Sequence, residues 1–405
     1  MTIVVGSTLI IYLIVLKIRK NVNLLDPMTL FPLIILSTYF LAILQLSGLQ
    51  HEYPTWFTLL IFAIIGVFLI GAKFANIMQW GKNNKNIKYT SWTINLLSFI
   101  MWVGILGSFF IEIIVLGPPP AISGTIRNQY FISGIGSIVT LQSAFWGMII
   151  YDRYHQKSLG KIFWLYVITI VVIAVLLSNK YQIIYMGLII LIAHNSFKKK
   201  IKIKTLAIFM GLIILLFIGL FVLVYQNMYN ITFDKIATAY QMKLPESLKV
   251  LSQPYLYVAF NYENLYGFLI SDHSDLYGLA TFQGFFKFFS LDALYSEETK
   301  SILAQRNEAL NIDAMNTGTM FEDFAQDGDI FIFIFTFLFG VLTCASYKNF
   351  KVNHNFFSFY LFVSTTAAIF MSFFVNSITY KMTLVNLLAA YFMSIILHKI
   401  IVKWG

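Results

Sequence analysis

The chain has 405 residues, of which 59% are hydrophobic and only 11% are charged, and its formal net charge is +10. With a mean hydropathy of +0.76, this composition excludes an ordinary soluble domain and is typical of a protein that crosses a membrane several times. The single cysteine, Cys344, excludes an intramolecular disulfide and a thiolate metal site.

Apolar runs follow one another along the chain, many of them near the roughly 17–25 residues that a helix needs to cross the hydrocarbon core. We predict an all-α polytopic membrane protein with about eleven transmembrane helices. The predicted spans are Thr2–Leu16, Met28–Leu49, Thr55–Met78, Trp92–Leu116, Ser133–Tyr151, Ile162–Ser178, Gln182–His194, Thr205–Tyr225, Ile330–Ser346, Phe356–Asn376 and Thr383–Val402. No basic region precedes the first run and no small-residue cleavage site follows it, so we expect a retained anchor.

One long polar segment, from about Gln226 to Asp327, interrupts this pattern. It holds most of the acidic residues and cannot lie in hydrocarbon, and a loop of this length in a compact chain is usually functional. We therefore expect three regions: an N-terminal bundle of about eight helices at 1–225, the polar segment at 226–327, and about three helices at 328–405.

The basic residues predict the orientation, because Lys and Arg are retained on the cytoplasmic side of a membrane. They gather in alternate connections, for example at Lys17–Lys20 and Lys198–Lys204, whereas the acidic residues gather in the others. This pattern predicts an external N-terminus, a cytoplasmic C-terminus and an external polar segment. The positive net charge therefore indicates topology and gives no reason to expect a nucleic-acid partner.

Two aromatic stretches lie inside the polar segment, at Tyr255–Ile270 and Tyr277–Phe289. Both mix rings with polar groups and are too polar to span a membrane, so they suit short helices that lie in the membrane interface. The alternative is an apolar lid packed on the outer ends of the bundle. Either arrangement predicts a partly apolar cavity at the outer membrane surface.

Four segments carry a resemblance to a known family. They are the Gly-Pro turn that leads to an arginine (Gly117–Arg127), a Tyr-x5-Asn-x2-Asn-Leu run (Tyr255–Leu265), a Leu-Tyr-Gly-Leu-Ala-Thr-Phe run (Leu276–Phe282) and the segment Asn316–Gly328 with its Asp-Phe-Ala. Together they resemble the Wzy-type oligosaccharide repeat unit polymerases of the O-antigen and exopolysaccharide polymerase family. Ala325 stands where that family usually has a glycine. The resemblance implies a GT-C-like glycosyltransferase architecture.

The resemblance also implies an activity. The protein is expected to polymerise undecaprenyl-diphosphate-linked oligosaccharides into an O-antigen, capsule or exopolysaccharide at the outer face of a bacterial cytoplasmic membrane. Its expected partners are this lipid-linked substrate and membrane lipids, with a chain-length regulator and a flippase as further candidates, and no cofactor is implied. Such chemistry needs fixed cations for the leaving diphosphate and a base for the acceptor hydroxyl.

Arg127 is the first candidate for binding the diphosphate, because it follows the rigid Pro118–Pro120 turn and guanidinium grips phosphate with two hydrogen bonds. Lys180 and Arg306 are further candidates. The alternatives are contacts with lipid headgroups or a loop carboxylate for Arg127, an interfacial anchor for Lys180 and a solvated ion pair for Arg306.

Asp323, Glu322 and Asp327 are the candidates for the catalytic base, because they lie just ahead of the ninth predicted span. A carboxylate there is also stabilised by the helix dipole, so the alternative is a simple cap of that helix. The Asp-Gly-Asp pattern of Asp327–Asp329 suggests a metal, but related enzymes place this pattern in the first external loop. We expect metal-independent transfer.

Three further residues are secondary candidates. Glu112 lies within an apolar run, where an acid is costly, and it is expected either to pair with Arg127 or to reach the interface. Asp272 and His273 form a polar cluster, and His273 resembles the histidine of the related O-antigen ligases. A solvated histidine is the alternative.

Three other classes of protein compete with a polymerase. A lipid-linked oligosaccharide flippase or small-molecule transporter should show internal repeats and polar helices at mid-membrane, and the sequence shows no obvious repeat. An O-antigen ligase would use a different acceptor. A membrane acyltransferase is disfavoured, because no histidine lies near an acid within an apolar run.

Overall fold

The computed structural model describes residues 2–18, 22–78, 89–123, 129–222, 226, 231–305 and 318–399. These residues form helices joined by loops and contain no β-sheet, so the predicted all-α class is confirmed. The chain divides into two compact units, each built from separate stretches of sequence. The first unit comprises residues 1–79, 232–348 and 365–384, and the second comprises residues 80–231, 349–364 and 385–405.

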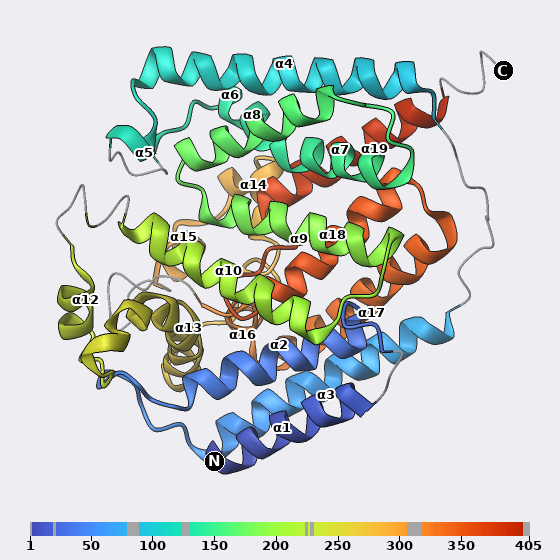
Figure 1. Ribbon diagram of the computed structural model, residues 1–405. Helices are drawn as coiled ribbons and strands as arrows, with labels where there is room; N and C mark the ends of the chain where they lie inside the picture. Colours follow the sequence, from blue (N-terminus) through green and yellow to red (C-terminus); the bar gives the residue numbers. More distant parts are fainter. Residues whose placement is uncertain are drawn as a thin grey trace. The chain divides into compact units, whose positions relative to one another are not determined.

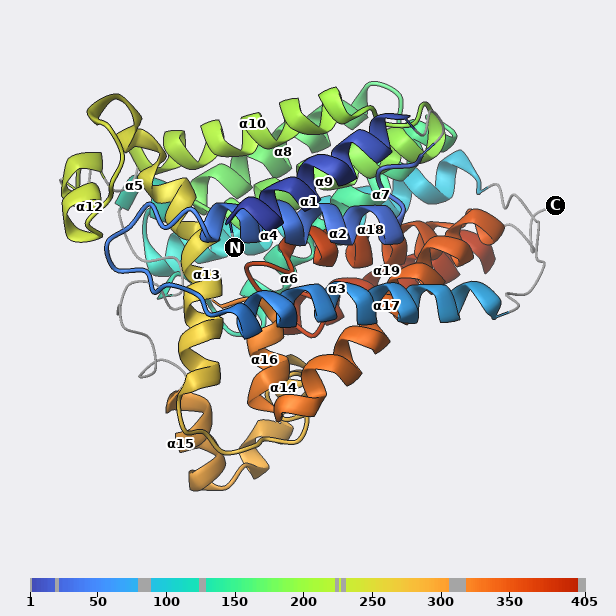
Figure 2. The same ribbon diagram turned by 90° about the horizontal axis from the view of Figure 1, so that it is seen from below.

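The first unit contains the helices before residue 79 and those of the long polar segment. They are α1 (Thr2–Ile18), α2 (Pro27–Ala42), α3 (Thr55–Ile77), α12 (Phe233–Ala239), η3 (Glu246–Leu251), α13 (Ser252–Ile270), α14 (Gln283–Phe288), η4 (Leu291–Leu294), α15 (Glu297–Gln305), α16 (Met320–Gln326) and most of α17 (Asp329–Asn353). Helix α2 contacts α1, α3 and α13 (Figures 1 and 2). The first of the two predicted aromatic stretches, Tyr255–Ile270, thus lies in α13, which packs on α2.

Helices α3 and α17 of the first unit cross at close range because each has a glycine at the crossing. A Cβ atom added at Gly71 would lie 2.2 Å from the Phe337 carbonyl oxygen, and one added at Gly340 would lie 2.3 Å from the Phe68 carbonyl oxygen. Small residues allow helices in membranes to approach in this way. Phe31 of α2 stacks on Phe68 next to the crossing, with ring centroids 3.8 Å apart.

The second unit contains the helices between residues 89 and 222. They are α4 (Ser91–Leu116), α5 (Pro120–Ser123), α6 (Ile135–Thr140), α7 (Gln142–His155), α8 (Ile162–Leu176), α9 (Lys180–Phe197) and α10 (Ile203–Phe221), together with parts of α17, α18 (Phe356–Met371) and α19 (Lys381–Lys399). Helix α4 contacts α6, and α7 contacts both α8 and α9. Buried Asp152 at the end of α7 accepts hydrogen bonds from the amides of Ser158 and Leu159, at 3.1 and 3.0 Å, and so holds the following loop.

The fifth predicted span is divided into two helices, α6 and α7, which meet at Leu141. The amide of Asn386 in α19 explains how this break is tolerated. Its oxygen accepts from the Ala144 N–H at 2.9 Å and its nitrogen donates to the Thr140 carbonyl at 3.1 Å. One side chain thus bonds both backbone groups that would pair with each other in a continuous helix.

Four stretches of the described residues are long and apolar enough to cross a membrane: α3, Ser91–Ser123 (α4 with α5), α10 and α17. Shorter apolar helices of 10–17 residues include α1, α2, α8 and α18. These helices indicate a membrane protein, as the composition predicts. The count of eleven spans, the GT-C-like architecture, the three-region division and the orientation of the termini stay predictions.

Candidate functional site

Asp327 is the most fully enclosed of the predicted acids, and its carboxylate binds backbone. Its two oxygens accept from the Ala280 and Thr281 amides, each at 2.9 Å. The side chain is completely buried. Burial raises the pKa of this carboxyl above its ordinary value, and the hydrogen bonds from Thr281, Ala280 and Gly278 oppose that shift. Asp327 therefore fixes the loop at Gly278–Thr281 onto the turn between α16 and α17.

Backbone contacts strengthen the same junction. The Leu276 N–H donates to the Gln326 carbonyl at 2.9 Å and the Tyr277 N–H donates to the Asp327 carbonyl at 3.2 Å. Gly328 has a φ of +125°, a conformation that favours glycine. These bonds account for two of the segments that carry the family resemblance, Leu276–Phe282 and the end of Asn316–Gly328, because they join the two together.

Glu322 and Asp323 lie in the short helix α16. Glu322 is 1% exposed, and its carboxylate fills the space over Gly318. Asp323 is half-buried, and its carbonyl lies 3.5 Å from the Thr281 hydroxyl. The structure thus brings the three predicted acids together in and beside α16, within the first unit.

The predicted cations are dispersed. Arg127 and Arg306 lie outside the described residues. Lys180 lies in the second unit, at the first residue of α9, and its ammonium is 5.3 Å from the ring centroid of Phe217 in α10. Burial lowers the pKa of Lys180 to about 8. An aromatic face attracts a cation at this distance.

The secondary candidates have local partners. Glu112 is buried in α4, and its carboxylate lies 3.5 Å from the Ile132 amide; the expected pairing with Arg127 lies outside the described residues. The His273 Nδ1 lies 2.9 Å from the Ser271 carbonyl, and its ring is 4.2 Å from that of Phe268. Asp272 is exposed. The histidine therefore packs on the end of α13, and its neighbour faces outward.

Another buried carboxylate, Glu263 in α13, was not among the predicted site residues. One of its oxygens is hydrogen-bonded to the imidazole Nδ1 of His51. Its other oxygen accepts from the Tyr53 hydroxyl and from the His51 amide, each at 3.2 Å. The Glu263 side chain is 6% exposed and that of His51 is 47% exposed. A buried acid thus holds a histidine whose ring reaches the surface.

The contact to Nδ1 determines what the imidazole can do. A carboxylate that accepts at Nδ1 holds the proton on that nitrogen, so that Nε2 of a neutral ring carries the lone pair. Burial, and secondarily the charge of Glu263, raise the pKa of the Tyr53 hydroxyl well above its ordinary value. Tyr53 therefore remains a hydrogen-bond donor to the acid. We call His51, Tyr53 and Glu263 the histidine–acid cluster.

Aromatic rings surround the histidine–acid cluster. The ring of Tyr266, one turn beyond Glu263 in α13, lies 5.8 Å from His51, 5.6 Å from Tyr53 and 6.0 Å from Trp56. Trp56 is 46% exposed at the start of α3. The cluster thus lies beside aromatic faces of the kind on which ring-shaped ligands can stack.

Hydrogen bonds hold the loop that carries His51. The Tyr255 hydroxyl donates to the Gln50 side chain at 2.6 Å and accepts from the Leu46 amide at 3.0 Å. The Ser47 hydroxyl donates to the Tyr240 carbonyl at 2.5 Å. Because α13 supplies both Tyr255 and Glu263, one helix positions the loop and its histidine together.

The sequence contained a signal for this cluster. Glu263 lies inside the Tyr255–Leu265 run, and it follows Tyr255 and Ala259 at helical spacing on a face that is buried. An acid on such a face needs partners. His51 and Tyr53 lie in the first predicted external connection, on either side of Glu52. The hydrophobic periodicity of the sequence does not indicate that this loop contacts a helix more than 200 residues later.

Comparison of the chain with known protein families, with curated proteins and with solved structures gives no match.

Proposed function

We propose that this protein is a membrane glycosyltransferase that polymerises undecaprenyl-diphosphate-linked oligosaccharide repeat units, and that His51 is its base. The observation that carries the proposal is the contact between Nδ1 of half-exposed His51 and the carboxylate of buried Glu263, beside the aromatic rings of Trp56 and Tyr266. The four segments that resemble the polymerase family supply the substrate class. One of them contains Glu263.

The proposed step transfers a glycan between two lipid-linked units. The hydroxyl oxygen of the acceptor sugar attacks the anomeric carbon of the growing chain, and its proton passes to Nε2 of His51. The bond from that carbon to the diphosphate breaks, and undecaprenyl diphosphate leaves with the bonding electrons. Glu263 stabilises the resulting imidazolium. Tyr53 and the His51 amide keep Glu263 in place.

The histidine–acid cluster is better suited to this step than the predicted base Asp327. The oxygens of Asp327 are occupied by the Ala280 and Thr281 amides, and the residue is completely buried. Proton transfer to an acceptor requires contact with it. Asp323 and Glu322 are the next candidates for the base, and they lie in the same unit.

The leaving diphosphate requires positive charge as its bond breaks. Arg127 remains the first candidate, with Arg306 and Lys180 after it. Arginine binds phosphate with two parallel hydrogen bonds and lysine does not. We therefore expect Arg127→Ala to abolish polymer formation and Arg127→Lys to recover little of it.

The test is reconstitution of the full chain in liposomes with lipid-linked oligosaccharides extracted from the producing cell. A polymerase makes a ladder of longer glycans, and His51→Gln is expected to slow the formation of this ladder by about 10²–10⁴-fold, the range of general-base catalysis. His194→Gln, at an exposed histidine of α9, is the matched control and should leave the ladder unchanged. Movement of the lipid across the bilayer without a ladder would make the protein a flippase. Transfer only to a different acceptor lipid would make it a ligase.

A further inference from the structure

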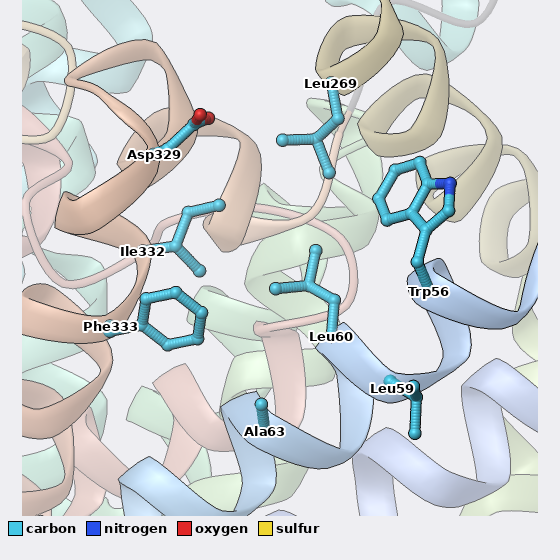
Figure 3. Close-up of a pocket in the computed structure, with 8 residues that line it drawn as sticks. All are labelled: Trp56, Leu59, Leu60, Ala63, Leu269, Asp329, Ile332 and Phe333. Carbon is cyan, nitrogen blue, oxygen red and sulfur yellow. The ribbon is translucent and has the colours of Figure 1, made fainter.

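An apolar groove lies within the first unit, between the first turns of α3 and α17. Its volume is about 440 Å³, within the ~300–1,000 Å³ of small-ligand sites. Among the residues that the structure describes, those that line it include Trp56, Leu59, Leu60, Leu269, Asp329 and Ile332. In Figure 3 the side chains of Trp56, Leu60, Leu269 and Ile332 surround an open centre, and Asp329 lies at its edge.

The paths of the two helices explain why this groove exists. Helices α3 and α17 touch through their backbones at Gly71, in the second half of α3, and at Gly340, near the middle of α17. The groove is lined by residues 56–63 of α3 and 329–333 of α17, which lie well before that crossing. The helices therefore diverge toward their first residues, and Leu269 at the end of α13 borders the space between them.

The position of the groove along the two helices points to a lipid. Both helices are long and apolar enough to span a membrane, and the groove lies among their first turns, so it is at the level where each helix enters the bilayer. Trp56 is half-exposed there, as tryptophan commonly is at this level. Leu59 is 62% exposed and gives the groove an apolar border.

Asp329 is the only charged residue that lines the groove within the part of the chain that the structure describes. It is exposed and is the first residue of α17, where a helix stabilises an anion. A carboxylate at this edge attracts an ammonium group and repels phosphate-rich headgroups. Because such a contact lies at the surface, it adds little to the affinity for a lipid and acts mainly on the choice between headgroups.

We propose that the groove holds one acyl chain of a bilayer phospholipid whose headgroup carries a primary amine, with the ammonium next to Asp329. The hydrocarbon chain covers Leu60, Leu269 and Ile332, and the amine forms a partly solvated ion pair. This site does not depend on the proposed catalytic step. A diphosphate-linked substrate would bring negative charge to Asp329.

Fluorescence of Trp56 can test the proposal. The full chain with Trp56 as its only tryptophan is reconstituted in phosphatidylcholine vesicles that contain brominated phosphatidylethanolamine or brominated phosphatidylglycerol. The amine lipid is expected to quench Trp56 about two- to five-fold more strongly, as for a surface ion pair. Asp329→Asn should abolish this preference, and Asp272→Asn, which removes an exposed acid of the same unit outside the groove, should preserve it.

Two results would overturn the proposal. Equal quenching by the two brominated lipids would mean that the groove has no headgroup preference, and stronger quenching by a brominated polyprenyl phosphate would assign it to the lipid carrier. If the single-tryptophan protein does not fold, native mass spectrometry of the unmodified chain and of Asp329→Asn gives the same comparison. The unmodified chain should retain phosphatidylethanolamine in preference to phosphatidylglycerol. Asp329→Asn should show no such preference, and a variant that kept it would contradict the proposal. A polymerase assay plays no part in either measurement, so failure here leaves the proposed function untouched.

Discussion

Glu263 and Asp327 are both buried carboxylates of the long polar segment, and they differ in what they bind. Asp327 accepts from the backbone amides of Ala280 and Thr281. Glu263 binds the side chains of His51 and Tyr53 as well as one amide. Backbone donors cannot exchange a proton with a ligand, whereas an imidazole can. The partners of a buried acid therefore separate a structural carboxylate from one that can serve chemistry.

The first way to test this difference is Glu263→Gln, which has the largest expected effect. The amide nitrogen of glutamine would donate to Nδ1 of His51 and shift the imidazole proton to Nε2, the nitrogen proposed to act as the base. We expect glycan transfer to fall by about 10²–10⁴-fold while the helical structure persists. Initial rates of ladder formation and circular dichroism of the same sample measure both quantities.

Glu263→Asp provides the control for that variant, because it keeps the charge and shortens the reach to His51. It should retain more activity than Glu263→Gln. Near-normal transfer by the glutamine variant would mean that the contact between Glu263 and His51 is structural. The base would then have to be sought among Asp323 and Glu322.

Asp327→Asn is expected to show the opposite pattern. Asparagine offers one acceptor oxygen, and its amide nitrogen would face the Ala280 or Thr281 N–H, so one buried donor loses its bond. This should lower the free energy of unfolding by about 1–3 kcal/mol and leave transfer per folded molecule unchanged. Denaturant unfolding in detergent gives the first quantity. Asp272→Asn, at an exposed acid, should change neither, and a loss of transfer without destabilisation in Asp327→Asn would return this residue to catalysis.

The sequence predicted the helical class and the approximate positions of most helices, because long apolar runs leave few alternatives. It also singled out the segments that contain Glu263 and Asp327. It could not show their partners, since Glu263 meets His51 across more than 200 residues and Asp327 meets Thr281 across 46. The break at Leu141 was equally hidden, because it depends on Asn386 in a distant helix.

The pH dependence of stability is a smaller expected effect that further distinguishes Asp327 from Glu263. Burial raises the pKa of Asp327 above its ordinary value. Between the ordinary and the raised pKa the folded state binds more protons than the unfolded state, so the contribution of Asp327 to stability is lost as the pH rises through the raised pKa. Thermal unfolding from pH 3.5 upward should show this decline, and Asp327→Asn should remove it. An unchanged profile in the variant would place the decline on another group.

Tyr53→Phe has the smallest expected effect. It tests whether the Tyr53 hydroxyl only positions Glu263 or takes part in proton transfer. The substitution removes one of three donors to Glu263 and keeps the ring that lies 5.6 Å from Tyr266. We expect a loss of roughly 0.5–1.5 kcal/mol in stability and less than about a tenfold loss in transfer, since 1.4 kcal/mol corresponds to tenfold. Tyr255→Phe, which removes the bonds to Gln50 and Leu46 instead, is the matched comparison. If Tyr53→Phe reduced transfer as far as Glu263→Gln, the hydroxyl itself would exchange the proton, and His51 would be its support.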